Sequence, residues 1–109
     1  MWNKPTEKRL AKIPTDTHEV SLRNKIVHLH FFLGGNDWYA IEYIPEKRLF
    51  FGYVIINGDI ENSEFGYFSF DELIGIKMSG MEVDCELAKY WKPTKITEIQ
   101  KIKHLVEGY

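Results

Sequence analysis

The sequence predicts an α+β domain, a four- to five-stranded antiparallel meander sheet with short N-terminal, middle and C-terminal helices. Two observations predict this class. Apolar segments rich in β-branched and aromatic residues alternate with short turns of Gly, Asn, Asp and Pro, which is typical of consecutive antiparallel strands. Helical spacing of apolar residues occurs only near the two ends and once between strands. We expect the helices to pack against one face of the sheet.

The first helix is expected to start at Pro5, because proline suits a first helical turn. Leu10 and Ile13 lie three residues apart and therefore share one helical face. Pro14 stops the helix, and residues 15–25 have no apolar period and are expected to form a loop.

Two strands, 26–33 and 38–44, are expected to form a β-hairpin around the turn sequence GGND. Two registers are open. With a four-residue loop, Leu33 pairs with Trp38, and the numbers of any two residues that face each other across the hairpin add up to 71. A longer loop or a bulge at Gly35 shifts the sum to 72.

The next strand, 48–56, is apolar on both faces, so we expect it to lie inside the sheet with both faces covered. A further antiparallel strand follows at 64–70. Ser69 and Glu72 fit a capping box that starts a short helix, and 81–87 is expected to form an edge strand.

A last helix is expected near the C-terminus, with Thr94 or Thr97 as its N-cap. Four apolar residues recur there at three-residue steps, which predicts one buried helical face. These residues are Ile96, Ile99, Ile102 and Leu105.

The 109 residues are expected to form a single domain, 1–109, in which 44% of the residues are apolar. No apolar run is long enough to cross a membrane, and no apolar stretch follows the basic N-terminus to make a secretory signal. Cys85 is the one cysteine, so no internal disulfide can form. We therefore expect a cytoplasmic protein that makes no membrane contact.

The net charge of −2 hides an acidic middle between basic ends. Residues 57–86 contain eight acidic residues and one basic residue, whereas residues 1–25 and 87–109 each carry a balance of +3. Such an acidic surface attracts a basic partner, although an ordinary solvated face is the alternative. The predicted partner-binding residues are Asp59, Glu61, Glu64, Asp71, Glu72, Glu82 and Asp84.

His28 and His30 alternate along the first strand, so both imidazoles can face one side and offer a metal two ligands. Glu42 is the natural third ligand. In the register in which paired residue numbers add up to 71, Glu42 lies on the other face of the hairpin. In the register in which they add up to 72, it lies opposite His30. A polar sheet face beside Tyr39 and Tyr43 suits histidine equally well. We interpret the pair as structural and expect no metal and no cofactor.

No catalytic constellation is found in the sequence. Cys85 lies between acidic residues, which raise the pKa of a thiol, and we expect it to be buried. The chain has neither a G-x-S-x-G motif nor a phosphate-binding glycine loop. We therefore expect a protein that acts by binding and is not an enzyme.

The basic ends support an alternative function, a regulatory or conjugation-associated module that binds nucleic acid. Aromatic residues in HFF and RLFFGY could stack on bases, although the pI of about 6.1 is low for such a module. If the first and last helices are neighbours, their basic residues form one patch. These residues are Lys4, Lys8, Arg9, Lys12, Lys92, Lys95, Lys101 and Lys103.

Several blocks of sequence together resemble a known family. They are LAKIPT (10–15), HLHFFLGGNDWYAIEY (28–43), LFFGYV (49–54), GDIENSEFGYFSFDEL (58–73), VDCEL (83–87) and WKP (91–93). Over nearly its whole length the chain resembles a domain-of-unknown-function family of small single-domain proteins encoded on plasmids, conjugative elements and phages. The family has no catalytic residues that could be carried over to this chain.

The resemblance implies an accessory protein of a mobile genetic element, in an anti-CRISPR-like context. Small acidic proteins from such elements often inhibit host defence nucleases, sometimes by imitating the charge of DNA. Together with the acidic segment, this makes a nuclease inhibitor that acts through its acidic surface our leading hypothesis, with a Cas9-type nuclease as the expected partner. The oligomeric state is left open.

Overall fold

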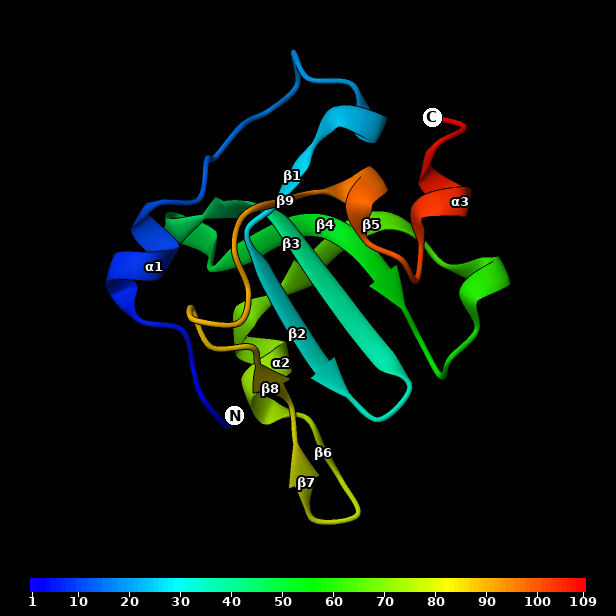
Figure 1. Cartoon of the computed structure of the whole chain (residues 1–109). Helices are drawn as coiled ribbons and strands as arrows, with labels where there is room; N and C mark the ends of the chain where they lie inside the picture. The colour runs from blue at the N-terminus through cyan, green and yellow to red at the C-terminus, as the bar shows by residue number, and fades with distance from the viewer.

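The computed structural model describes all residues, 1–109, and confirms the α+β class (Figure 1). Its centre is a five-stranded antiparallel sheet with the strand order β5-β4-β3-β2-β8. Strands β2 to β5 form the predicted meander, because each pairs with the next, and β8 joins the other side of β2. The strands are β2 Leu29–Leu33, β3 Asn36–Ile44, β4 Leu49–Ile55, β5 Glu64–Ser69 and β8 Asp84–Cys85.

Two small ladders and several short helices complete the fold. β1 Ile26–Val27 pairs with β9 Thr94–Lys95, and β6 Lys77–Met78 pairs with β7 Met81–Glu82. The strand predicted over 81–87 is therefore divided between β7 and β8. None of the helices combines the length and the apolar character that a membrane crossing needs. The helices are α1 Glu7–Ala11, α2 Phe70–Gly75 and α3 Lys103–Val106, with 3-10 turns η1 Leu22–Asn24, η2 Pro45–Lys47, η3 Ile60–Asn62 and η4 Ile96–Glu98.

The β2–β3 hairpin has a two-residue turn, so both registers expected from the sequence are wrong. Leu33 pairs with Asn36, and paired residue numbers sum to 69. Gly34 has a φ of +57°, which the first position of a type II′ turn requires. The side chain of Asn36 donates to the Leu33 carbonyl at 3.0 Å and accepts from the Asn57 amide at 2.9 Å. These bonds hold Asn36 in β3, although its residue type is typical of a turn.

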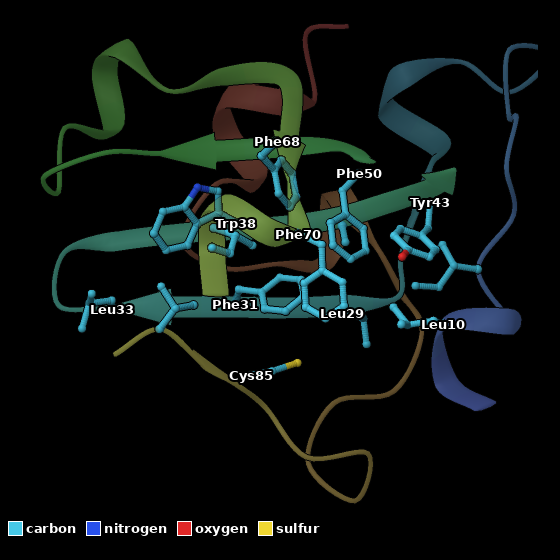
Figure 2. Close-up of a cluster of buried hydrophobic side chains, with 14 residues drawn as sticks. Leu10, Leu29, Phe31, Leu33, Trp38, Tyr43, Phe50, Phe68, Phe70 and Cys85 are labelled. Atoms are coloured by element: carbon cyan, nitrogen blue, oxygen red, sulfur yellow. The ribbon is translucent and has the colours of Figure 1, made fainter. Parts of the chain in front are cut away.

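The sheet is covered on both faces, so the expectation that the helices lie on one face is wrong. α1 and α2 pack on one face and build the larger core (Figure 2). η4 and α3 pack on the other face through Ile96, Ile102 and Val106. β4 contributes to both cores, as predicted for a strand covered on both sides. The larger core consists of Leu10, Ile13, Leu29, Phe31, Leu33, Trp38, Ala40, Tyr43, Phe50, Phe68, Phe70, Leu73, Val83 and Cys85.

The C-terminal segment is not one continuous helix, which corrects the prediction. The Ile99 amide donates to the Ile96 carbonyl at 3.2 Å, and the Ile102 amide donates to the Ile99 carbonyl at 3.1 Å. Bonds across three residues are the 3-10 pattern, and a strict three-residue repeat suits that pattern better than the 3.6-residue period of an α-helix. α3 begins after Ile102, its N-cap, so neither predicted threonine caps it. Val106 is fully buried, whereas Leu105 is only half-buried.

The first two helices begin with side-chain caps. Thr6 accepts a hydrogen bond from the Arg9 amide at 3.2 Å at the start of α1. The predicted Ser69 cap is confirmed, because Ser69 accepts from the Glu72 amide at 3.2 Å. α2 therefore starts directly at the end of β5, and the acidic residues of its first turn lie at that end of the strand.

Candidate functional site

Five of the seven predicted partner-binding residues flank the two ends of β5. Asp59 is the N-cap of η3, Glu61 lies within η3, and Glu64 is the first residue of β5. Asp71 and Glu72 lie in the first turn of α2, after the last residue of β5. At about 3.4 Å per strand residue, the two groups are separated by roughly 20 Å. We call β5 together with these five residues the acidic edge.

The other two residues lie in β8, at the opposite edge of the sheet, and in β7, just before it, and both are engaged within the chain. Asp84 belongs to β8, and its carboxylate accepts from the Cys85 amide at 2.8 Å and from the Asn3 side chain at 3.1 Å. Glu82 pairs with the N-terminal ammonium group of Met1. The hydrogen bond from this group holds the pKa of Glu82 below its usual range. Both residues therefore tie the N-terminus to the sheet.

Most carboxylates of the acidic edge are free. Glu61, Glu64 and Glu72 make no ion pair within the chain. Asp71 pairs with Arg48 Nε at 2.8 Å, but both side chains are more than a third exposed, so water screens this pair. The chain from η3 to the end of α2 contains no basic residue. The acidic edge therefore carries a net negative charge.

The outer side of β5 has unpaired backbone groups. The Phe70 amide donates to the Arg48 carbonyl at 2.9 Å, in register with the β4–β5 ladder. In an antiparallel ladder every second residue forms backbone hydrogen bonds with the same neighbouring strand. Phe68, Gly66 and Glu64 therefore bond to β4, as Phe70 does. The N–H and C=O groups of Phe65 and Tyr67 consequently point away from the sheet, where no further strand pairs with β5. β5 is a free sheet edge.

Aromatic side chains lie beside this free edge. The ring centroid of Phe51, from β4, lies 5.1 Å from that of Tyr67 and 6.1 Å from that of Phe65. Tyr109 packs edge-on against Phe65 at 5.1 Å. Tyr67 is 65% exposed. Phe51 and Tyr67 also line the largest cleft of the molecule, of about 430 Å³, so the edge combines negative charge with accessible aromatic surface.

A buried lysine fixes the wall of that cleft. Lys25 is only 5% exposed, and its Nζ donates to the carbonyl and hydroxyl oxygens of Thr17, each at 2.7 Å. Thr17 donates to the Glu42 carboxylate from its amide at 2.9 Å and from its hydroxyl at 2.5 Å. A β-bulge between Ala40 and Glu42 shifts the register of β3 at this point. The loop is thereby tied to the sheet, and Glu42 binds Thr17 instead of a histidine.

His30 belongs to a network of charged side chains on the face covered by η4 and α3. Its Nε2 forms a hydrogen bond with Asp37 at 2.7 Å, and its Nδ1 forms one with Glu86 at 2.8 Å. Lys101 Nζ donates to the second oxygen of Asp37 at 2.6 Å. The imidazole stacks on Tyr39, with 4.5 Å between centroids and 6° between planes. The imidazole is therefore held between the carboxylates of Asp37 and Glu86.

The network contains two opposing effects on Asp37, whose side chain is 7% exposed. Burial raises the pKa of this carboxyl, but the hydrogen bonds from His30 and Lys101 outweigh burial, so the pKa lies below its usual value. His28 lies outside the network, and burial lowers the pKa of its imidazole. No three His, Cys, Asp or Glu side chains are arranged to hold a metal ion.

Cys85 is buried in the larger core and is 1% exposed. Burial raises the pKa of its thiol to about 11. Its sulfur lies 3.6 Å from the Glu86 carbonyl oxygen. A thiol of this kind is protonated at neutral pH and is not accessible to a substrate.

The sequence contains no local signal for the His30 network. Glu86 lies 56 positions after His30, and Lys101 lies 64 positions after Asp37. Asp37 itself follows two turn glycines, so its residue type suggests a turn. Pairing across the hairpin and the path of the C-terminal segment bring these side chains together.

No protein-family model, curated protein or solved structure matches the chain. The fold and its surfaces define a small α+β protein with a free, acidic sheet edge. The resemblance to a family from mobile elements therefore stays an expectation from the sequence.

Proposed function

We propose that the protein acts by binding a basic segment of another protein at the acidic edge, and that this partner is a host defence nuclease of the Cas9 type. One observation carries the proposal. Five acidic residues flank the two ends of a strand whose outer side is unpaired. A free edge supplies backbone bonding groups, and the flanking carboxylates select for positive charge.

An extended segment of the partner adds to β5 as a further strand. The outward N–H and C=O groups of Phe65 and Tyr67 pair with its backbone. Lys or Arg side chains of the segment reach the carboxylates at the two ends of β5, and their apolar stems pack on the exposed Tyr67 ring. Backbone pairing supplies affinity in this arrangement, and charge supplies specificity.

A nuclease meets these requirements because the groove that holds nucleic acid must be basic. An acidic protein bound in that groove excludes the substrate, and the resemblance to proteins of mobile elements supports this kind of partner. Opposite charges also attract over a distance and speed association. Inhibition is expected to weaken as salt rises, because the screening length falls.

Reversing two charges of the acidic edge, in Glu61→Lys/Glu64→Lys, is expected to weaken partner binding roughly tenfold or more. Both side chains are exposed and make no ion pair within the chain, so the fold should be retained. The measurement is a Cas9 cleavage assay at low and high salt, with the protein preincubated with the bare or the guide-loaded nuclease. Binding to the DNA substrate alone is measured alongside.

The matched control is Glu19→Lys/Glu98→Lys, which makes the same change in net charge at exposed residues that do not flank β5. It is expected to inhibit nearly as well as the wild type. Equal effects of the two double variants would show that net charge and not the acidic edge drives binding. No inhibition of either form of Cas9 by the wild type would contradict this choice of partner.

Proline at position 67 tests the strand addition separately. Tyr67→Pro removes one outward N–H and no ladder bond to β4, so β5 should still pair with β4. We expect it to bind several-fold more weakly than Tyr67→Ala, which loses the same ring but keeps the amide. Titration calorimetry against the nuclease measures both affinities. Equal affinities of the two variants would rule out backbone pairing at this edge.

A further inference from the structure

A basic cleft lies between α1 and residues 88–93, beside β2 and away from β5. α1 and α3 pack on opposite faces of the sheet, so the eight basic residues considered from the sequence do not all form one patch. Three of them, Arg9, Lys12 and Lys92, line this cleft together. The basic residues of α1 lie beside residues 88–93 instead. The cleft has a volume of about 230 Å³, and no acidic side chain lines it. Its lining includes Arg9, Lys12, His28, Trp91, Lys92 and Pro93.

Hydrogen bonds hold the walls of the basic cleft in place. Arg9 donates from Nη1 to the Glu86 carbonyl at 3.0 Å, and the Glu86 side chain bonds to His30. Trp91 donates from Nε1 to the Val27 carbonyl at 3.2 Å. The 86–93 segment is thereby fixed to β1 and β2, and Arg9 is fixed to that segment. The site is formed before any ligand arrives, which lowers the entropy that binding costs.

The donors in the basic cleft are largely unused. A guanidinium has about five N–H donors. The Arg9 side chain uses one of them on the Glu86 carbonyl and also lies beside the Cys85 thiol, which leaves the others unused. Lys12 and Lys92 are exposed and make no ion pair. Three positive charges thus surround a small cavity that no carboxylate neutralises. An oxyanion is the ligand that this arrangement favours.

We infer that the basic cleft binds the phosphate group of a nucleotide unit, either free or within a nucleic acid strand. The Arg9 fork matches the geometry of phosphate oxygens, and the two lysines add point charges. The cleft is smaller than the roughly 300–1,000 Å³ of typical small-molecule pockets, so it suits one phosphate and its sugar. Trp91 and Pro93 give that sugar an apolar wall. This site is separate from the acidic edge and does not depend on the proposed function.

The test is a titration of isotope-labelled protein followed by NMR, with inorganic phosphate, AMP and a short oligothymidylate as separate probes. We expect shifts at the Arg9 and Lys92 amides and at the Trp91 indole N–H. In Lys12→Ala/Lys92→Ala, affinity for the bound probe is expected to fall about tenfold or more. Tighter binding of the oligothymidylate than of AMP identifies a strand as the ligand, and equal binding identifies a free nucleotide.

Lys77→Ala/Lys103→Ala is the matched control, because it removes two exposed lysines that lie on β6 and α3 and line no cleft. It is expected to bind within about twofold of the wild type, apart from a small loss of general attraction. The inference is overturned if none of the three probes shifts the cleft resonances. It is equally overturned if the two double variants lose the same affinity.

Discussion

Replacing Gly52 with alanine is expected to lower the free energy of unfolding by about 3 kcal/mol or more. Gly52 of β4 pairs with Ala40 of β3, inside the sheet. An added Cβ would overlap the carbonyl oxygen of Tyr39, and it would lie 2.8 Å from the Tyr39 carbonyl carbon and 3.2 Å from Ala40 Cα. These backbone atoms belong to a central strand paired on both sides, so they cannot move aside without breaking ladder bonds.

Urea denaturation of the wild type and of Gly52→Ala measures this effect. A loss of that size would lower the melting temperature by more than about 10 °C in a domain of this length. Gly66 provides a matched control, because it pairs with Gly52 across β4 and β5 and an added Cβ there has nothing within 4 Å. Gly66→Ala should be nearly neutral. Equal stability of the two variants would contradict the close approach of β3 to Gly52.

Replacing Asp37 with asparagine is expected to cost about 2–4 kcal/mol of stability at neutral pH. The buried carboxylate accepts one hydrogen bond on each oxygen, from His30 and from the Lys101 ammonium group. Asparagine has nearly the same shape, but it places an amide NH₂ group against one of these donors. Against His30, whose side chain is 14% exposed, this leaves a ring nitrogen without its acceptor in a largely buried site, which is the costly part of breaking such a pair. Lys101 is 41% exposed and can bond to water instead.

The cost of Asp37→Asn is expected to depend on pH. Because the pKa of Asp37 is lowered in the folded state, its contribution is complete above the ordinary aspartate pKa of about 4 and is lost as pH falls through the lower folded pKa. The difference in unfolding free energy between wild type and variant should therefore be constant near neutral pH and shrink below about pH 4. Urea denaturation at a series of pH values measures this difference.

Asp71→Asn is the matched control for burial. Asp71 also pairs with a cation, Arg48 Nε at 2.8 Å, but its side chain is 66% exposed. An exposed pair contributes about 0–1 kcal/mol, so this variant should lose little stability. A loss as large as that of Asp37→Asn would show that burial is not the source of the effect.

The acidic and basic segments of the sequence form two separate surfaces of the folded protein. The acidic edge is built from η3, β5 and α2, which come from the acidic middle of the chain. The basic cleft is built from α1 and residues 88–93, which come from the two basic ends. β5 is the last strand on one side of the sheet, and the cleft lies beside β2 towards the other side. A basic protein segment and a phosphate group would therefore bind at different places.

Much of the fold follows from local properties of the sequence. The alternation along β2, the apolar run of β4 and the Ser69 cap each depend on neighbouring residues, so the strands and the start of α2 were predictable. The C-terminal segment was harder, because three isoleucines at steps of three fit an α-helix and successive 3-10 turns alike. Packing against the sheet selects the 3-10 turns there.

The sequence by itself determined the α+β class, the order of most elements and the residue types of the acidic edge. Only the tertiary structure decided the register of the β2–β3 hairpin, the free outer side of β5, and the contacts of His30 and Lys25. The physical reason is the distance along the chain over which each interaction acts. Strand and cap propensities act over a few residues. Register, edge position and buried charge pairs depend instead on which distant segments pack together. Side-chain contacts such as those of Asn36 then select among locally similar alternatives.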